Sequence, residues 1–232
     1  MQWQPNGGET MNILIACEYS GTVRDAFIKA GHNAQSCDIL PSDSKSGKHW
    51  QGRVEQLLAY PRMHPFDMMI AFPPCTHLAV SGARWFKNKQ KEQKEAIDFF
   101  MLLADANIPK IAIENPVGIM STKWRKPDQI IQPWAFGHNA SKKTCLWLKN
   151  LPPLKPTNII HGKLFCCGEE LTGAISEDKY GCPNCCGQKT AKRRHANQTK
   201  SGQNKLGPSP NRGKIRSLTY NGIADAMATQ WR

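Results

Sequence analysis

Short apolar runs alternate with stretches of helical periodicity through the first half of the chain. The runs have the length and composition of buried strands, and they cover residues 12–18, 33–38, 67–72 and 110–113. Of the helical segments between them, 92–107 is the clearest, because its apolar side chains recur at helical spacing. Strand and helix in alternation indicate a parallel sheet with helices on both faces, so we expect a Rossmann-like α/β fold.

Each predicted strand ends in a polar or reactive residue. In chain order these residues are Cys17 and Glu18, Asp38, Pro73 to Cys75, and Glu114 to Pro116. Because ligands of such sheets bind at the carboxyl ends of the strands, we expect one site at this edge. Asp38 follows the second strand, where an acidic side chain holds the ribose hydroxyls in nucleoside-binding sheets.

The sequence Phe-Pro-Pro-Cys at residues 72–75 follows directly on an apolar strand. Two prolines fix the backbone and remove two amide donors, so Cys75 is presented on a stiff turn. A cysteine taken at random is more often a buried structural residue. The position of Cys75 at a strand end, with the Glu114 carboxylate at the end of another strand, favours a nucleophile instead.

Three ordered elements of the chain resemble the DNA cytosine-5 methyltransferases. Residues 67–82 (DMMIAFPPCTHLAVSG) resemble the nucleophile segment of that family, including a glycine seven residues after the cysteine, here Gly82. The Glu-Asn-Pro at 114–116 resembles its Glu-Asn-Val element. The Phe-Gly at 136–137, followed by Lys142, is similar to its Phe-Gly element with a later Gln-x-Arg-x-Arg. The resemblance implies a short, phage-like member of the family, of the restriction-modification type.

The resemblance also implies a mechanism and its residues. Cys75 would add to carbon 6 of a cytosine flipped out of the duplex, with S-adenosylmethionine as the methyl donor. Glu114 would donate a proton to ring nitrogen 3, and Lys142 would lie by the cytosine carbonyl oxygen or favour the thiolate. The alternatives are a capping or surface carboxylate for Glu114 and a solvated surface lysine for Lys142.

The cofactor loop departs from the family pattern. Residues 17–21 retain one of the two glycines of the family's loop, with Tyr19 at the first glycine position. The family's acidic contact to the adenine amine falls near Arg53, and the second arginine of the later element is Thr144. Residues 219–227 are similar to a C-terminal piece that closes the cofactor pocket. The expected cofactor-binding residues are Cys17, Glu18, Tyr19, Ser20, Gly21, Asp38, Pro73 and Asn221.

Five cysteines lie between residues 165 and 187. Cys182 and Cys185 have the Cys-x-x-Cys spacing of a zinc knuckle. We expect Cys166 and Cys167 to complete a tetrahedral Zn(2+) site in a small Cys-rich module, with Cys186 or His161 as substitutes. A cluster of free thiols is the alternative.

The chain carries a formal charge of +13, and lysines and arginines gather in residues 188–217. A basic protein favours polyanionic partners, because neutralised phosphates release counterions. We expect Lys192, Arg193, Arg194 and Arg212 to contact DNA phosphates. A solvated linker is the alternative for this segment.

These features predict a methyltransferase core over residues 11–154, a zinc-binding and DNA-contact insertion over 155–217, and a closing segment over 218–232. The chain has no apolar run that could cross a bilayer and no export signal, so we expect a cytoplasmic monomer without a membrane partner. The expected activity is methylation of carbon 5 of cytosine in DNA. The same chemistry on RNA or on a cytosine nucleotide is one alternative, and a catalytically inactive zinc-containing DNA-binding protein is another.

Overall fold

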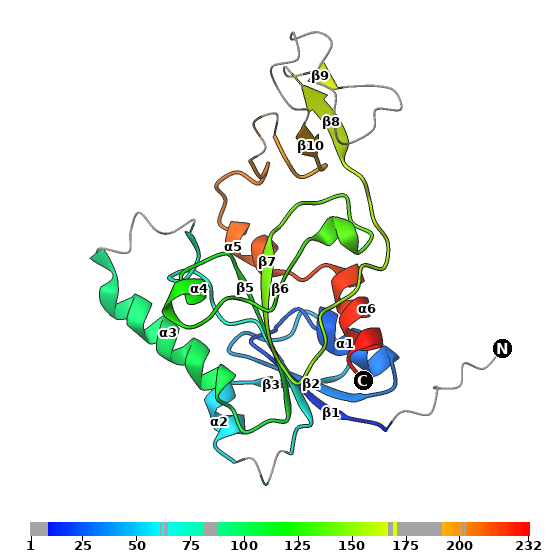
Figure 1. The fold of residues 1–232 in the computed structure, drawn as a ribbon. Helices are drawn as coiled ribbons and strands as arrows, with labels where there is room; N and C mark the ends of the chain where they lie inside the picture. The colour runs from blue at the N-terminus through cyan, green and yellow to red at the C-terminus, as the bar shows by residue number, and fades with distance from the viewer. Residues whose placement is uncertain are drawn as a thin grey trace, which may run out of the picture. The chain divides into compact units, whose positions relative to one another are not determined.

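The computed structural model describes residues 9–60, 62, 65–80, 88–166, 169–170, 192–199, 201 and 203–232 (Figure 1). Its strands are β1 (Asn12–Ala16), β2 (Asn33–Asp38), β3 (Lys48–Gln51), β4 (Met68–Ala71), β5 (Lys110–Pro116), β6 (Gln129–Ile131), β7 (Thr144–Lys149), β8 (Lys163–Cys166), β9 (Glu169–Glu170) and β10 (Lys192–Arg194). Its helices are α1 (Thr22–Lys29), α2 (Val54–Leu58), α3 (Gln90–Ala104), α4 (Met120–Lys123), the 3-10 helix η2 (Pro133–Ala135), α5 (Arg212–Ser217) and α6 (Asn221–Gln230). Within these ranges no helix combines the length and apolar character needed to span a membrane.

Seven strands form the main sheet in the order β3-β2-β1-β4-β5-β7-β6. The first five pair in parallel, whereas β7 is antiparallel to both of its neighbours. The order β3-β2-β1-β4-β5 is that of a doubly wound sheet, in which the connections change face between β1 and β4. The mixed α/β fold expected from the sequence is therefore confirmed.

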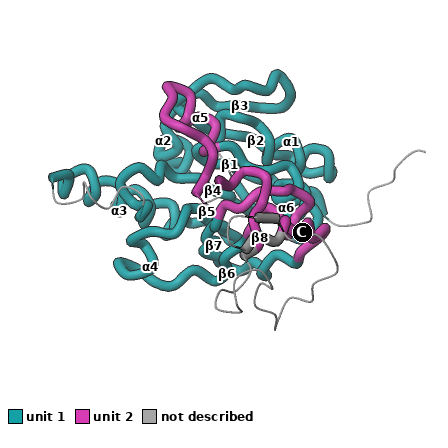
Figure 2. Tube along the Cα trace, turned by 90° about the horizontal axis from the view of Figure 1, so that it is seen from above, with its two compact units in different colours: residues 1–131, 143–155, 218–232 teal, residues 132–142, 156–217 magenta. Residues whose placement is uncertain are grey.

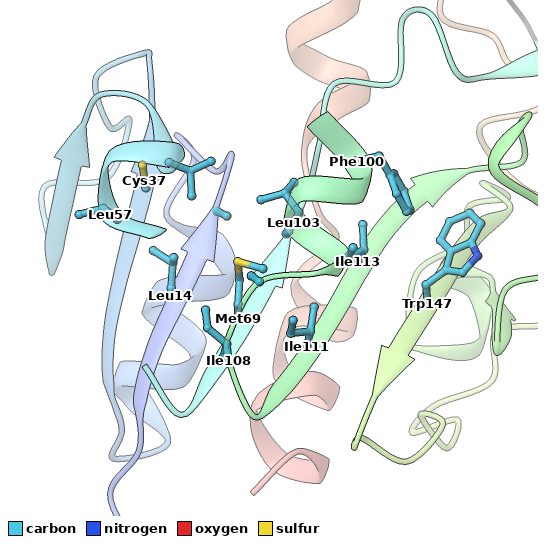
Figure 3. Packing of buried hydrophobic residues seen from close by; sticks show 14 of the residues in the cluster. Leu14, Cys37, Leu57, Met69, Phe100, Leu103, Ile108, Ile111, Ile113 and Trp147 are labelled. Atoms are coloured by element: carbon cyan, nitrogen blue, oxygen red, sulfur yellow. The ribbon is translucent and has the colours of Figure 1, made fainter. Parts of the chain in front are cut away.

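Alternate side chains along the central strands pack on opposite faces of this sheet. Leu14, Met69 and Ile111 point toward the face covered by α2 and α3, where Phe100 and Leu103 complete the packing (Figure 3). On the other face α1 packs against β1 and β2, and α6 packs against α1 (Figure 1). Because each fully buried side chain of this size contributes about 1.5–3 kcal/mol, these two layers hold the strand ends in place.

The structure also contains elements that the sequence pattern does not predict. β3 reads Lys-His-Trp-Gln and is an edge strand, so it lacks the apolar run of a central strand. β5 continues past Glu114 to Pro116, because β7 pairs with it over residues 111–116. The final helix begins at Asn221 and ends at Gln230.

The chain divides into two compact units (Figure 2). Unit 1 comprises residues 1–131, 143–155 and 218–232 and contains the seven-stranded sheet. Unit 2 comprises residues 132–142 and 156–217 and contains the sheet β10-β8-β9, in which β8 is antiparallel to both neighbours. Residues 132–142, which the sequence-based division assigns to the catalytic core, thus belong to unit 2.

Candidate active site

The strand register aligns the carboxyl ends of four parallel strands. Ala16 of β1 pairs with Cys37 of β2 and with Ala71 of β4, and Ala71 pairs with Ile113 of β5. The residues that follow at this level are, strand by strand, Cys17, Asp38, Phe72 and Glu114. The strand ends that the sequence analysis singled out therefore meet at one edge of the sheet. The change of face between β1 and β4 makes this edge the topological position at which open α/β sheets bind ligands.

The carboxyl group of Glu18 caps the start of α1. Glu18 is 5% exposed, and it accepts hydrogen bonds from Val23 N–H at 2.7 Å and Arg24 N–H at 3.3 Å. The Ser20 hydroxyl donates a third bond at 3.2 Å. Burial raises the pKa of Glu18, although these donors act in the opposite sense. Two amides of the first turn of α1 are thus occupied by a side chain from the segment that precedes the helix.

Gly21 lies directly against Arg24 in this turn. Gly21 has a φ of +77°, and a Cβ added there would lie 2.6 Å from Arg24 Nη2 and 2.7 Å from Ser44 Cβ. Arg24 is fully buried; its Nε donates to Asp25 at 2.8 Å and its Nη1 donates to Ser36 Oγ at 2.9 Å. The glycine is therefore required by the packing and backbone of the turn, whatever ligand approaches it.

Cys17 and Asp38 lie on neighbouring strand ends. Cys17 has a left-handed backbone with φ 59°, a conformation that costs a residue with a side chain about 1–2 kcal/mol. Burial, followed by the nearby charge of Asp38, raises the pKa of Cys17. Asp38 is half-buried, and its Oδ1 accepts Leu40 N–H at 2.9 Å in a local turn. Non-glycine residues with a left-handed backbone are found more often at functional turns than elsewhere.

The Pro-Pro-Cys turn leaves β4 with Cys75 exposed. The Phe72 N–H donates to the Ala16 carbonyl at 2.9 Å, which ties the start of the turn to β1. After the thiol, the Cys75 carbonyl accepts Leu78 N–H at 3.0 Å and Ala79 N–H at 2.9 Å. The chain therefore turns back immediately after Cys75 and leaves its side chain on the surface.

The other thiols of unit 1 have different surroundings. Cys37 and Cys145 are buried, and burial raises the pKa of Cys37 to about 12 and that of Cys145 to about 11. Buried, protonated thiols of this kind are chemically inert. Of the four described thiols, Cys75 alone is exposed, since Cys17 is half-buried.

Asn115 connects the turn that carries Cys75 to β5. It is 1% exposed, and its Nδ2 donates to the Pro73 carbonyl at 2.9 Å. Further along, Ala79 forms an antiparallel bridge with Gly118, and a Cβ on Gly118 would meet the Leu78 carbonyl oxygen. The segment after β4 and the segment after β5 are therefore packed backbone against backbone.

Glu114 lies half-buried within β5, opposite Leu146 of β7. After burial, the charge of Glu114 is the second cause that raises the pKa of Cys145, so its carboxyl lies within electrostatic reach of β7. Successive strand residues point to opposite faces, so Glu114 and Asn115 project from opposite sides of β5.

Lys142 belongs to unit 2. Its N–H donates to Gln132 Oε1 at 2.9 Å, and its ammonium donates to the Arg216 carbonyl at 3.0 Å. Arg216 lies in the last turn of α5, where backbone carbonyls attract a cation. Lys142 is thus held both at its backbone and at the end of its side chain.

The basic residues expected at DNA differ in their surroundings. Arg193 is exposed and its Nη1 donates to the Gly162 carbonyl at 3.2 Å, whereas Arg194 and Arg212 are half-buried. Lys192 lies in β10, which pairs with β8. None of the residues of α5 is buried.

The remaining expected site residues lie at the periphery or beyond the described ranges. Asn221 is exposed at the first position of α6. Cys167, Cys182 and Cys185 lie outside the described residues, as does the side chain of Cys166. Among the side chains that the structure does describe, no cluster of three or more His, Cys, Asp or Glu residues could hold a metal ion.

Sequence reasoning assigned no role to Arg24, Asn115 or Gly118. Arginine is rarely fully buried, so no local pattern indicates that Arg24 packs against Gly21. A signal for Asn115 does exist, because a polar residue within an apolar strand needs a hydrogen-bond partner. For Gly118, only the packed structure shows the close approach to Leu78.

No family model and no curated protein matches this chain. Among solved structures, the methyltransferase EhMeth of Entamoeba histolytica is similar at 14% identity and a TM-score of 0.45, covering 66% of this chain and 59% of that protein. A triple mutant of Spodoptera frugiperda DNMT2 is similar at 15% identity and a TM-score of 0.40, covering 65% of this chain and 54% of that protein. This chain therefore spans less than two thirds of the length of either protein.

Proposed function

We propose that this chain is an S-adenosylmethionine-dependent methyltransferase that modifies carbon 5 of cytosine in DNA. The observation that carries the proposal is the bond from Asn115 to Pro73 at 2.9 Å. Asn115 follows Glu114, and Pro73 precedes Cys75 by two residues. The bond therefore joins the two segments to which the sequence resemblance assigns the acid and the nucleophile.

The capped start of α1 favours a nucleoside cofactor that has no phosphate at this position. Dinucleotides place their pyrophosphate on open amides at the corresponding helix start. Here Glu18 already accepts the amides of Val23 and Arg24, so a phosphate would meet a carboxyl group. Asp38, half-buried at the end of β2, is suited to the ribose hydroxyls. S-adenosylmethionine fits this pattern, since it has a cationic sulfonium and no phosphate.

The proposed reaction begins at Cys75. Its thiolate adds to carbon 6 of the flipped cytosine, which forms a carbon–sulfur bond and makes carbon 5 nucleophilic as an enamine. Glu114 donates a proton to ring nitrogen 3, where negative charge would otherwise develop. S-adenosylmethionine, when bound, supplies the methyl group to carbon 5. Transfer of the carbon 5 proton to solvent then breaks the carbon–sulfur bond and releases the thiolate of Cys75. Ring nitrogen 3 returns its proton to Glu114 as the aromatic ring is restored.

The basic residues of unit 2 support a nucleic acid over a free nucleotide. α5 contains Arg212, Lys214 and Arg216 and has no acidic residue in its first turn. Cations of this kind contact phosphates and carry no direct sequence information. Because such contacts do not separate DNA from RNA, both substrates need to be tested. We also propose that the cysteine-rich segment binds Zn(2+), as the spacing of Cys182 and Cys185 predicts.

The proposal is tested with labelled S-adenosylmethionine and matched DNA and RNA oligonucleotides. Transfer to DNA is expected, and DNA that contains 5-fluorocytosine should trap a covalent adduct, because fluorine cannot leave as a proton does. Cys75→Ser should abolish transfer and adduct while calorimetry shows unchanged cofactor binding. Cys37→Ala, which removes a buried thiol, is the matched control and should retain the adduct. Transfer to RNA alone would reassign the substrate, and the absence of both transfer and cofactor binding would overturn the proposal.

The contribution of the basic segment is tested by salt titration of DNA affinity. Replacing the three basic residues 192–194 by glutamine should flatten the slope of log affinity against log salt by up to about 2.7, since each DNA phosphate that is no longer neutralised removes about 0.9. The control replaces Lys89, Lys91 and Lys94, an equal number of basic residues at the start of α3. A slope that responds equally to both sets would show a general charge effect rather than phosphate binding by this segment.

A further inference from the structure

The basic segment of unit 2 is bonded to the peptide that precedes Lys142. Asn197 Oδ1 accepts Ser141 N–H at 2.9 Å, and Asn197 Nδ2 donates to the Ser141 carbonyl at 2.9 Å. One side-chain amide thus takes both backbone groups of a residue that lies 56 positions away. The pair of bonds imitates the exchange between two residues of adjacent antiparallel strands.

Asn197 is itself fixed by the bonds of its own turn. Its carbonyl accepts Lys205 N–H at 2.8 Å, and the carbonyl of Ala196 accepts Lys205 Nζ at 2.8 Å. At the start of the turn, the ring of His195 stacks on Trp134 with the planes 3° apart and the centroids at 5.9 Å. Hydrogen bonds and ring stacking therefore fix the turn that contains Asn197, so the bonds of its side-chain amide can restrain Ser141.

The bonds from Asn197 to Ser141 also restrain Lys142. It follows Ser141 directly, so the peptide that Asn197 holds fixes the direction in which the lysine side chain leaves the backbone. At its far end the ammonium donates to the Arg216 carbonyl at 3.0 Å. Asn197 and Arg216, which hold the Ser141 backbone and the Lys142 ammonium, both lie within residues 188–217, whereas the Lys142 N–H is held by Gln132.

We propose that Asn197, within the basic segment of residues 188–217, is a positioning residue for Lys142 and acts through its two bonds to the Ser141 backbone. The consequence for turnover rests on the proposed function, whereas the positioning itself does not. Removing the Asn197 amide leaves the half-buried backbone groups of Ser141 without these two bonds. The Lys142 side chain then samples more directions.

The positioning is tested by the rate at which Lys142 is acetylated in the full-length protein, followed by mass spectrometry without DNA or cofactor. Asn197→Ala should raise that rate about 2- to 10-fold, the range that one neutral hydrogen bond controls. Asn197→Asp keeps the acceptor for the Ser141 N–H but sets a carboxylate oxygen against the Ser141 carbonyl, so it should also raise the rate. This variant provides the test if the alanine variant fails to fold. Asn204→Ala is the matched control, because the Asn204 side chain accepts the nearby Leu206 N–H and does not reach Ser141. An unchanged Lys142 rate in a folded Asn197 variant would overturn the proposal.

The consequence for catalysis is tested by a double-mutant cycle. Asn197→Ala should lower kcat at saturating DNA and cofactor by about the same 2- to 10-fold, and it should have no further effect in a Lys142→Met background. An equal loss in both backgrounds would show that Asn197 supports the fold and does not act through Lys142. If the wild-type protein transfers no methyl group, the proposed function fails, while the acetylation rates still decide the positioning.

Discussion

The bond between Asn115 and Pro73 gives a sharp test of how the turn that carries Cys75 is held. Asn115 is 1% exposed, its Nδ2 donates to the Pro73 carbonyl at 2.9 Å, and its Oδ1 has no partner among the described residues. Asn115→Ala leaves the Pro73 carbonyl without its donor, which costs about 1–3 kcal/mol of unfolding free energy. Asn115→Asp sets a carboxylate against that carbonyl, so its cost should exceed that of the alanine variant.

The assay is urea unfolding at neutral pH, with the alkylation rate of Cys75 as a local reporter. Asn150→Gly is the matched control, because Asn150 also donates to a proline carbonyl, that of Pro109, at 2.8 Å, but in an exposed position. Asn150 has a φ of 55°, which glycine accepts without strain, so the control should lose less than about 1 kcal/mol. The reasoning is refuted if the unfolding free energy of Asn115→Ala lies within about 0.5 kcal/mol of the wild-type value and the alkylation rate of Cys75 does not change.

Three further predictions concern the acid, the cap and the metal. Glu114→Gln should lower turnover by about 100-fold or more and leave cofactor affinity unchanged. Glu92→Gln, a change at an exposed residue of α3, serves as the control. Activity of the Glu114 variant within a few-fold of wild type would remove Glu114 from the mechanism. The folded-state pKa of Glu18 is raised above 4.5, so the stability that Glu18 contributes is complete below pH 4.5 and is lost as pH rises through the folded-state pKa. As pH rises from 4.5 through the folded-state pKa, the unfolding free energy of Glu18→Gln should therefore increase relative to that of wild type. A difference in unfolding free energy between the two proteins that does not change with pH would contradict this account. Protein purified under reducing conditions should carry about one zinc ion, less in Cys182→Ser and Cys185→Ser variants, and metal analysis that finds none would rule out the site.

The strand ends could be located from the sequence because each central strand is an apolar run with an abrupt polar end. Asp38 and Glu114 were found in this way, and the parallel register places them at one edge. β3 could not be found, since an edge strand such as Lys48–Gln51 needs no apolar run. The buried guanidinium of Arg24 was equally hidden, because its partners at Asp25 and Ser36 come from different elements of the fold.

The close approach of Gly118 to Leu78 has a consequence for how the edge can move. A side chain at residue 118 would collide with the Leu78 carbonyl oxygen, and the bridge from Gly118 to Ala79 continues the same backbone packing. Because the two peptide backbones are in contact with no side chain between them, neither can shift far without displacing the other. A displacement of residues 78–79 therefore also displaces the segment that follows β5. The turn that carries Cys75 and the strand that carries Glu114 are thus coupled through contacts between backbones, and neither segment can shift far without the other.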